Sequence, residues 1–245
     1  MDCGEYCVRG SSVISSVLLQ VASLFILLTN VAAADGMQPE TTVVVLYEEA
    51  GEATLNVKNT DAGPALLHSV VENVPEDQAP LLIVTPPITR VEAGDTQLVR
   101  FIGTSTEPLK TQRLKRVSFE GIPQARAAGA ATIGITLRQN LPLILHPRGL
   151  PWHHTPWELL VWRRAGEQLT VHNDSAYVVR LAPDVRLLPQ GVPATLPRAY
   201  LLPGETLTAK ADGPMAGSVT VEIQPATVYG FSVDSYQAPI TQGEG

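Results

Sequence analysis

The stretch VTPPITRVEAGDTQLVRF, residues 84–101, holds two short runs of β-forming residues with turn signals around them. Val, Ile, Thr and Phe favour strands, whereas the paired prolines and the segment Glu92-Ala93-Gly94-Asp95 favour breaks and turns. The stretch therefore predicts short strands joined by a tight turn rather than a long helix.

The residues on both sides continue this pattern. Between Thr41 and Leu145 we count seven strand-like runs, the number that an immunoglobulin-like sandwich of about 100 residues requires. The segment RGLPWHHTPW, residues 148–157, has no periodic pattern and is typical of a short, stiff connection, and a second set of strand-like runs follows it. We therefore expect an all-β protein of two tandem immunoglobulin-like β-sandwich domains, at residues 35–147 and 157–245, joined by a linker at 148–156.

The first 34 residues are typical of a cleaved secretory signal peptide. Residues 13–28 carry no charge, and Ala32-Ala33-Ala34 provides a small-x-small pattern that signal peptidase accepts. The apolar run is shorter than the roughly 20 residues of a membrane-spanning helix, so we expect no membrane span in the mature protein. Both cysteines, Cys3 and Cys7, precede this run, so we expect the mature chain to fold without a disulfide.

Composition and motifs argue against nucleic-acid binding and catalysis. The 245 residues carry 17 Lys and Arg against 24 Asp and Glu, and this net charge of −7 gives no basic footprint for a nucleic acid. The sequence contains no GxSxG, GxGxxG, P-loop or HExxH motif. No nearby Asp or Glu pattern would complete a metal site with His146, His153 and His154, so we expect these histidines to be solvated. We expect no bound metal, no cofactor and no catalytic residue.

Two further groups of residues are expected to be structural. In an acidic protein, four clustered basic residues are interpreted as a solvated strand face: Lys110, Arg113, Lys115 and Arg116. Three tryptophans near the expected boundary are predicted to pack the interdomain joint or the second core: Trp152, Trp157 and Trp162.

The segment ATIGITLRQNLPLIL, residues 131–145, alternates large aliphatic residues with small or polar ones. Ile133, Ile135 and Leu137 fall on one face of an extended strand. The pattern fits two alternatives: an ordinary half-buried strand, or an edge strand that lends its apolar face to another protein.

Residues 84–101 closely resemble the PP-hydrophobic-x-R-hydrophobic-E-x-G segment of periplasmic pilus-assembly chaperones of the PapD-like type. Further landmarks follow the family's order: Asn59, Gly121-Ile122-Pro123, Pro147, Val171-His172-Asn173, Tyr177-Val178-Val179 and Leu201-Leu202-Pro203-Gly204. The resemblance spans nearly the whole mature chain, and it favours the edge-strand alternative for residues 131–145.

The resemblance implies a non-enzymatic periplasmic chaperone whose partners are pilin or fimbrial subunits and an outer-membrane usher. Such subunits lack their final strand, and the chaperone's seventh strand fills the gap. Counting back from Pro147 places the donated aliphatic residues at Ile133, Ile135 and Leu137. The alternatives are a fimbrial structural subunit or surface adhesin, and an enzyme or metal protein supported only by the histidines.

The chain departs from the family at two groups of positions. The Arg and Lys that anchor the subunit's terminal carboxylate align to Thr42 or Val43 and to Pro142. Arg138 shares a strand face with Pro142, so it is a candidate anchor if the subunit binds in a shifted register; otherwise Arg138 is solvated. The ionic network that joins the family's two domains aligns to Gln112, His146 and approximately Val228, so we expect its joint replacement.

Overall fold

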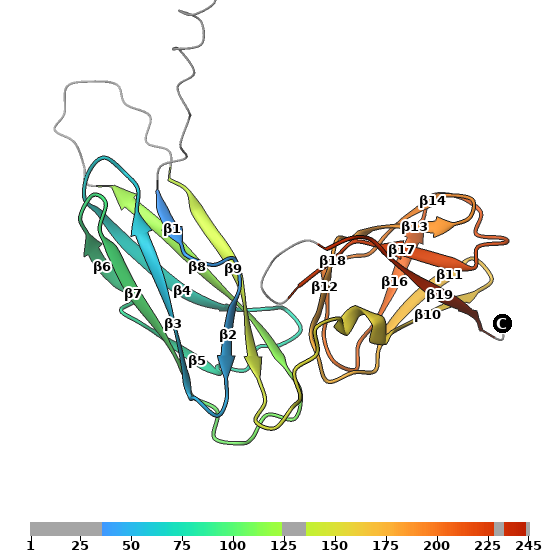
Figure 1. The fold of residues 1–245 in the computed structure, drawn as a ribbon, viewed down its shortest axis with the longest axis horizontal. Helices are drawn as coiled ribbons and strands as arrows, with labels where there is room; N and C mark the ends of the chain where they lie inside the picture. The colour runs from blue at the N-terminus through green and yellow to red at the C-terminus, as the bar shows by residue number, and fades with distance from the viewer. Residues whose placement is uncertain (1–35, 124–135, 228–232, 244–245) are drawn as a thin grey trace, which may run out of the picture. The chain divides into compact units, whose positions relative to one another are not determined.

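The computed structural model describes residues 36–123, 136–227 and 233–243. These residues form strands and one short 3-10 helix, arranged as two successive sets of sheets (Figure 1). Within the described ranges, no helix is long and apolar enough to cross a membrane.

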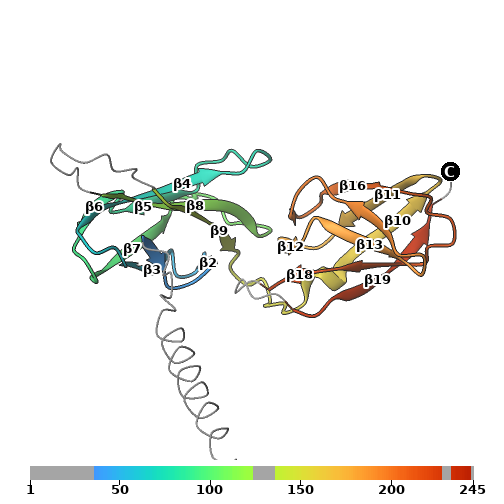
Figure 2. The ribbon, with the colours of Figure 1, turned by 90° about the horizontal axis from the view of Figure 1, so that it is seen from above.

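The first set consists of two sheets that enclose one core. One sheet has the order β1 (Met37–Pro39), β3 (Glu52–Asn59), β7 (Thr96–Gly103), β5 (Leu82–Thr85). The other has the order β2 (Val44–Tyr47), β9 (Arg138–His146), β8 (Arg113–Pro123), β4 (Ala65–Asn73), β6 (Ile88–Val91). Figure 2 shows β4 and β8 as a layer above β3 and β7. Phe101 and Phe119 meet edge-on between the layers, with ring centroids 6.5 Å apart.

The stretch at residues 84–101 has the predicted strand and turn structure. It ends β5, forms β6, turns at Gly94 and begins β7. Gly94 has φ of 80°, a conformation that glycine adopts without strain. The fully buried Asn59 fastens this turn, because its side-chain amide donates to the carbonyls of Gly63 and Val91 at 3.0 Å each.

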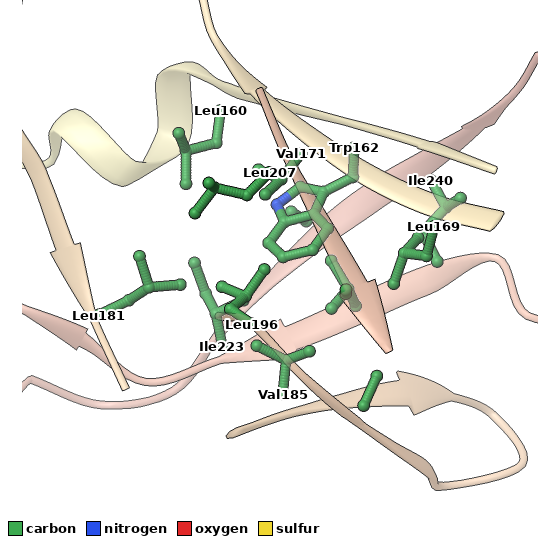
Figure 3. Packing of buried hydrophobic residues seen from close by; sticks show 14 of the residues in the cluster. Leu160, Trp162, Leu169, Val171, Leu181, Val185, Leu196, Leu207, Ile223 and Ile240 are labelled. Atoms are coloured by element: carbon green, nitrogen blue, oxygen red, sulfur yellow. The ribbon is translucent and has the colours of Figure 1, made fainter. Parts of the chain in front are cut away.

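The second set begins with the 3-10 helix η1 (Pro156–Leu159). Its strand pairing closes into a ring in the order β10 (Leu160–Ala165), β11 (Gln168–Asn173), β16 (Thr206–Ala211), β14 (Val192–Thr195), β13 (Asp184–Leu188), β17 (Thr220–Ile223), β19 (Tyr236–Gln242). A small sheet adds β15 (Tyr200–Leu201), β12 (Val179–Leu181) and β18 (Pro225–Ala226). Trp162 is 1% exposed at the centre of this core, among Val171, Leu207 and Ile223 (Figure 3).

The two sets meet without sharing a sheet, which confirms the expected all-β architecture of two tandem domains. The exact domain limits stay a prediction. A small apolar cluster, which we call the interdomain joint, connects the two domains; it consists of Val43, Val74, Leu114, Ile144 and Val178. Trp152 packs against this joint, whereas Trp157 and Trp162 lie in the second core, as the sequence predicted.

The interpretation of the basic cluster as a solvated strand face is wrong for Lys115. Its side chain is 1% exposed, and its ammonium group donates to the carbonyl of Asp77 at 2.7 Å and lies 3.1 Å from the Asp77 carboxylate. Arg113 pairs with the same carboxylate. Lys115 alternates with Val117 and Phe119, which face the core, so strand periodicity turns its side chain inward.

Candidate functional site

Strand β9 has an edge that is only partly paired. On one side it pairs with β8 from Arg138 to Leu145. On the other side β2 pairs only with Leu143–His146, so within the described part of the chain no strand pairs with the second edge of residues 138–142. Backbone groups along this stretch, which we call the open edge, can pair with a strand of another protein.

Along the open edge, the side chains on the apolar face of β9 become more exposed toward the start of the strand. Leu143 is fully buried and Leu141 is 9% exposed, whereas Leu137, on the same face, is 46% exposed. Ile133 and Ile135 lie outside the described residues, so the structure places only Leu137 of the three predicted donated residues. A large aliphatic side chain exposed beside an open edge is what an added strand could cover.

Arg138 lies on the opposite face of β9, and its guanidinium group already has partners. It forms an ion pair with Glu72 of β4, and its Nη2 donates to Ser118 Oγ of β8 at 2.9 Å. Ser118 Oγ in turn donates to Glu72 at 2.9 Å. The positive charge of Arg138 is therefore compensated by a carboxylate of the same domain.

A second arginine, Arg116 of β8, lies on this face, where the sequence predicted only a solvated side chain. The register of β8 and β9 places it directly opposite Pro142. Its Nη2 donates to the Asn140 carbonyl at 2.7 Å and its Nε to the Asn140 side-chain oxygen, so the guanidinium group lies over β9. Alternation of residues 112–120 could have indicated this face, but only the pairing register shows the neighbour.

Burial affects the pKa of Arg116 and of one arginine in the second domain, Arg180. Burial lowers the pKa of Arg116, while the charges of Tyr200 and Glu72 oppose that shift. On β12, burial also lowers the pKa of Arg180, and the like charge of Arg116 lowers it further. Each domain therefore contributes one partly buried guanidinium group whose pKa burial lowers.

The interdomain joint contains a neutral hydrogen-bond network at the aligned family positions. Gln112 Nε2 lies 2.9 Å from His146 Nδ1, and His146 Nε2 lies 2.9 Å from the Leu150 carbonyl. A carbonyl only accepts, so His146 donates from Nε2 and accepts from Gln112 at Nδ1. Gln112 Oε1 accepts from the Val178 amide at 2.8 Å. Val228 lies outside the described residues.

An ionic contact between the domains occurs elsewhere. Glu76 lies 3.0 Å from Nη1 of Arg198, and its carboxylate accepts a hydrogen bond of 2.7 Å from the Tyr200 hydroxyl. Arg198 also pairs with Glu205. Burial and the contact with Glu76 raise the pKa of Tyr200 to about 12.

The histidines near the linker pack among aromatic rings. His146 is 5% exposed, which corrects the expectation of a solvated side chain, and its ring lies 5.3 Å from Tyr47 and 5.5 Å from Trp152. His154 meets Trp152 edge-on and His153 lies 5.4 Å from Tyr177. Across the described ranges, no three His, Cys, Asp or Glu residues form a metal-binding group.

Comparison with known proteins gives consistent relatives. Residues 36–151 match the family model described as "Pili and flagellar-assembly chaperone, PapD N-terminal domain". The "Uncharacterized fimbrial chaperone YhcA" of Escherichia coli K12 is 39% identical over 215 residues, which cover 87% of this chain and 95% of YhcA. The chaperone protein HifB of Haemophilus influenzae is 28% identical over 200 residues, which cover 76% of this chain and 81% of HifB.

Solved structures share the fold. A chain from the complex of the Salmonella enterica SafA pilin with the SafB chaperone superposes with a TM-score of 0.68, at 22% identity, covering 85% of this chain and 98% of that one. The Escherichia coli chaperone DraB gives 0.64 at 21% identity, covering 84% and 97%. The fold, the sequence landmarks and these relatives together show that the chain belongs to the family of PapD-like fimbrial chaperones, rather than to the fimbrial subunits or adhesins.

Proposed function

We propose that the mature protein is a periplasmic chaperone that binds pilin-type subunits through the open edge of β9 and delivers them to an outer-membrane usher. The observation that carries the proposal is the exposure of Leu137 at 46% beside unpaired backbone. Two relatives named as chaperones, one of them as a fimbrial chaperone, and a neighbour solved with a pilin support it.

Binding proceeds by β-strand addition in this proposal. The subunit's strand pairs with the backbone of the open edge, while Ile133, Ile135 and Leu137 fill the groove left by the subunit's missing strand. Full burial of one such side chain contributes about 1.5 to 3 kcal/mol. Three of them contribute enough to hold an incomplete sandwich that would otherwise aggregate.

The location follows from the same proposal. Residues 1–34 direct export, and the mature chain from about Asp35 works in the periplasm, where a chaperone meets newly exported subunits. Transfer to an outer-membrane usher then releases the subunit from β9.

Co-expression with a secreted pilin-type subunit encoded in the same genome tests the proposal. Leu137→Asp should abolish co-purification of the subunit, because the carboxylate would be buried without a partner. The thermal midpoint of the free chaperone should stay close to that of the unmodified protein, since Leu137 is largely outside the core.

Leu141→Asp is the matched control, four residues further along the same face and 9% exposed. It should lower the thermal midpoint markedly through damage to the chaperone's own core. Recovery of the subunit by folded Leu137→Asp at the unmodified level would exclude the donated role of this residue.

A further inference from the structure

A pocket lies where strands β2 and β9 end side by side. Tyr47, the last residue of β2, pairs with His146, the last residue of β9. The cavity has a volume of about 370 Å³, at the small end of the range of about 300 to 1,000 Å³ for ligand pockets. Its lining includes Tyr47, Glu49, His146, Leu150, Trp152 and His154. We call it the aromatic pocket.

Three rings of the aromatic pocket are close together but not parallel. The ring centroid of Tyr47 lies 5.3 Å from that of His146 and 6.2 Å from that of Trp152. The ring planes of these two pairs are inclined by 58° and 42°, and the planes of His146 and Trp152 by 42°. Rings inclined in this way form a wedge rather than a flat slot, so a rounded group fits them better than a planar one.

The lining of the aromatic pocket is negatively charged. Nδ1 of His146 accepts a hydrogen bond from Gln112 at 2.9 Å. Nδ1 of His154 accepts one from the indole of Trp152 at 3.3 Å. A ring nitrogen that accepts a hydrogen bond carries no proton, so both histidines are neutral in this arrangement. Of the described residues that line the pocket, only Glu49 then carries a charge.

The charged residues just outside the lining compensate each other. Glu48 accepts hydrogen bonds of 2.8 Å from the backbone amides of Leu109 and Arg148. The bond from Arg148 is the main cause of a lowered pKa of Glu48, so Glu48 stays anionic beside the positive charge of Arg148. Among the described residues Glu49 forms no ion pair, so its carboxylate is available to a ligand.

The chain that carries Trp152 is already held in place. The Leu150 carbonyl accepts from Nε2 of His146 at 2.9 Å, and the Pro151 carbonyl accepts from the Tyr177 hydroxyl at 2.6 Å. These two bonds fasten the residues directly before Trp152 to both domains. A ligand therefore meets rings that are already arranged, and its binding does not require the ordering of a loop.

We propose that the aromatic pocket binds a small quaternary ammonium cation. The faces of aromatic rings attract cations, and several rings together form the usual binding site for quaternary ammonium groups. Glu49 adds the attraction of a carboxylate at the same place. This proposal does not rest on the proposed function, because the pocket lies apart from the open edge of β9.

Other cations fit the aromatic pocket less well. A metal ion needs several ligating side chains, and the described residues contain no group of three His, Cys, Asp or Glu. A primary ammonium group is strongly hydrated, and a guanidinium group is planar and suits a flat slot. The head group of a lipid would bring a phosphate next to Glu49, and no described cationic side chain lines the pocket to hold it. The pocket therefore favours a free cation.

Titration of the mature protein with choline tests the proposal. The NMR signal of Trp152 Nε1–H, identified by its absence in Trp152→Phe, should shift saturably. The neutral isostere 3,3-dimethylbutan-1-ol has carbon in place of nitrogen and should bind at least about 10-fold more weakly, because the rings and the carboxylate both attract the charge. Phosphocholine should bind more weakly than choline, and equal or tighter binding would overturn the assignment to a free cation.

Three variants test the residues. Tyr47→Leu should weaken choline binding by about 5- to 30-fold, the range for a cation held over an aromatic ring. Glu49→Gln should weaken it by about 2- to 5-fold, as expected for an exposed carboxylate. The matched control is Glu167→Gln, which removes an exposed carboxylate between β10 and β11 and should leave the affinity unchanged.

The contradicting results are equally clear. Absence of a saturable Trp152 shift with choline, or equal affinities for choline and its neutral isostere, would overturn the proposal. Unchanged choline affinity in folded Tyr47→Leu would also overturn it. Equal effects of Glu49→Gln and Glu167→Gln would remove Glu49 from the site and with it the charge argument.

Discussion

Nε2 of Gln112 and Nδ1 of His146 lie 2.9 Å apart in the joint between the two domains. The resemblance to PapD-like chaperones places ionic partners at both positions, and here both are neutral. Loss of one partner from a buried ion pair costs about 3 to 5 kcal/mol, whereas replacement of both avoids an uncompensated charge. At Gln112 and His146 the two domains are therefore joined by directional hydrogen bonds rather than by an ion pair.

Gln112→Ala should destabilise the protein by about 2 to 4 kcal/mol. Gln112 is 2% exposed, and the substitution leaves the Val178 amide and His146 Nδ1 without partners, each costing about 1 to 3 kcal/mol. Urea unfolding of the mature protein measures the loss. Gln237→Ala, on an exposed position of β19, should change stability by less than about 0.5 kcal/mol. Equal effects of the two substitutions would show that the joint network does not stabilise the fold.

Tyr200 should ionise late in an alkaline titration followed by ultraviolet absorbance. Burial and the hydrogen bond to Glu76 raise its pKa to about 12, above the usual value near 10. The neutral hydroxyl is the form that the folded protein favours, so its stabilising contribution is complete below pH ~10 and disappears as the pH rises through about 12.

Tyr200→Phe should remove this late titration step, and Tyr236→Phe should leave it in place. Tyr200→Phe should also not lose stability between pH ~10 and about 12, because phenylalanine has no hydroxyl group to ionise. Glu76 retains its ion pair with Arg198 in this variant. A late step that survives in Tyr200→Phe would assign it to another tyrosine.

Much of the fold could be predicted, because apolar alternation and turn residues are both visible within short stretches of sequence. Alternating apolar residues identified most strands of the first domain, and the Gly94 turn identified how two of them connect. Strands β14 and β19 are harder to predict, because Pro193 and Pro239 interrupt their β-forming residues. These strands are stabilised by pairing with distant segments, which local sequence does not reveal.

The hydrogen-bond arrangement around Asn59 also occurs in the second domain, around Asn173. Asn173 donates from Nδ2 to the Tyr177 carbonyl at 2.8 Å, and its own carbonyl accepts from the Gly204 amide at 2.7 Å. Gly94 makes the equivalent bond to the Asn59 carbonyl at 2.9 Å. This hydrogen-bond arrangement needs only a few residues, too few to be recognised as a sequence repeat.

For the candidate site, the sequence could predict only how the residues of β9 are arranged along that strand. Alternation placed Leu137 and Arg138 on opposite faces of β9, but the partner of Arg138 lies on β4, 66 residues away. The position of Arg116 opposite Pro142 depends on the register of two strands. This relationship leaves no pattern in a single segment.

Residues 1–34 should be absent from the mature protein. Mass spectrometry of protein purified from the periplasmic fraction should give a chain that begins near Asp35, after the Ala32-Ala33-Ala34 pattern. Substitution of Ala32 and Ala34 by leucine should block cleavage, because signal peptidase accepts small residues at these positions. An intact N-terminus in the unmodified protein would refute export by a cleaved signal.

The buried contact of Lys115 with Asp77 gives the largest predicted effect on stability. Asp77→Asn leaves Lys115 buried without a carboxylate and should cost about 3 to 5 kcal/mol. Lys115→Met should cost less, because Asp77 keeps its ion pair with Arg113. Adding Lys115→Met to Asp77→Asn should restore part of the lost stability.

Burial alone would raise the pKa of Asp77, but hydrogen bonds from Arg113 and Lys115 outweigh burial and lower that pKa. The contribution of Asp77 is therefore present above pH ~4 and declines as the pH falls through the lowered pKa. Urea unfolding should show a larger difference between the unmodified protein and Asp77→Asn at pH 7 than at pH 2, and an equal difference at both values would contradict this account.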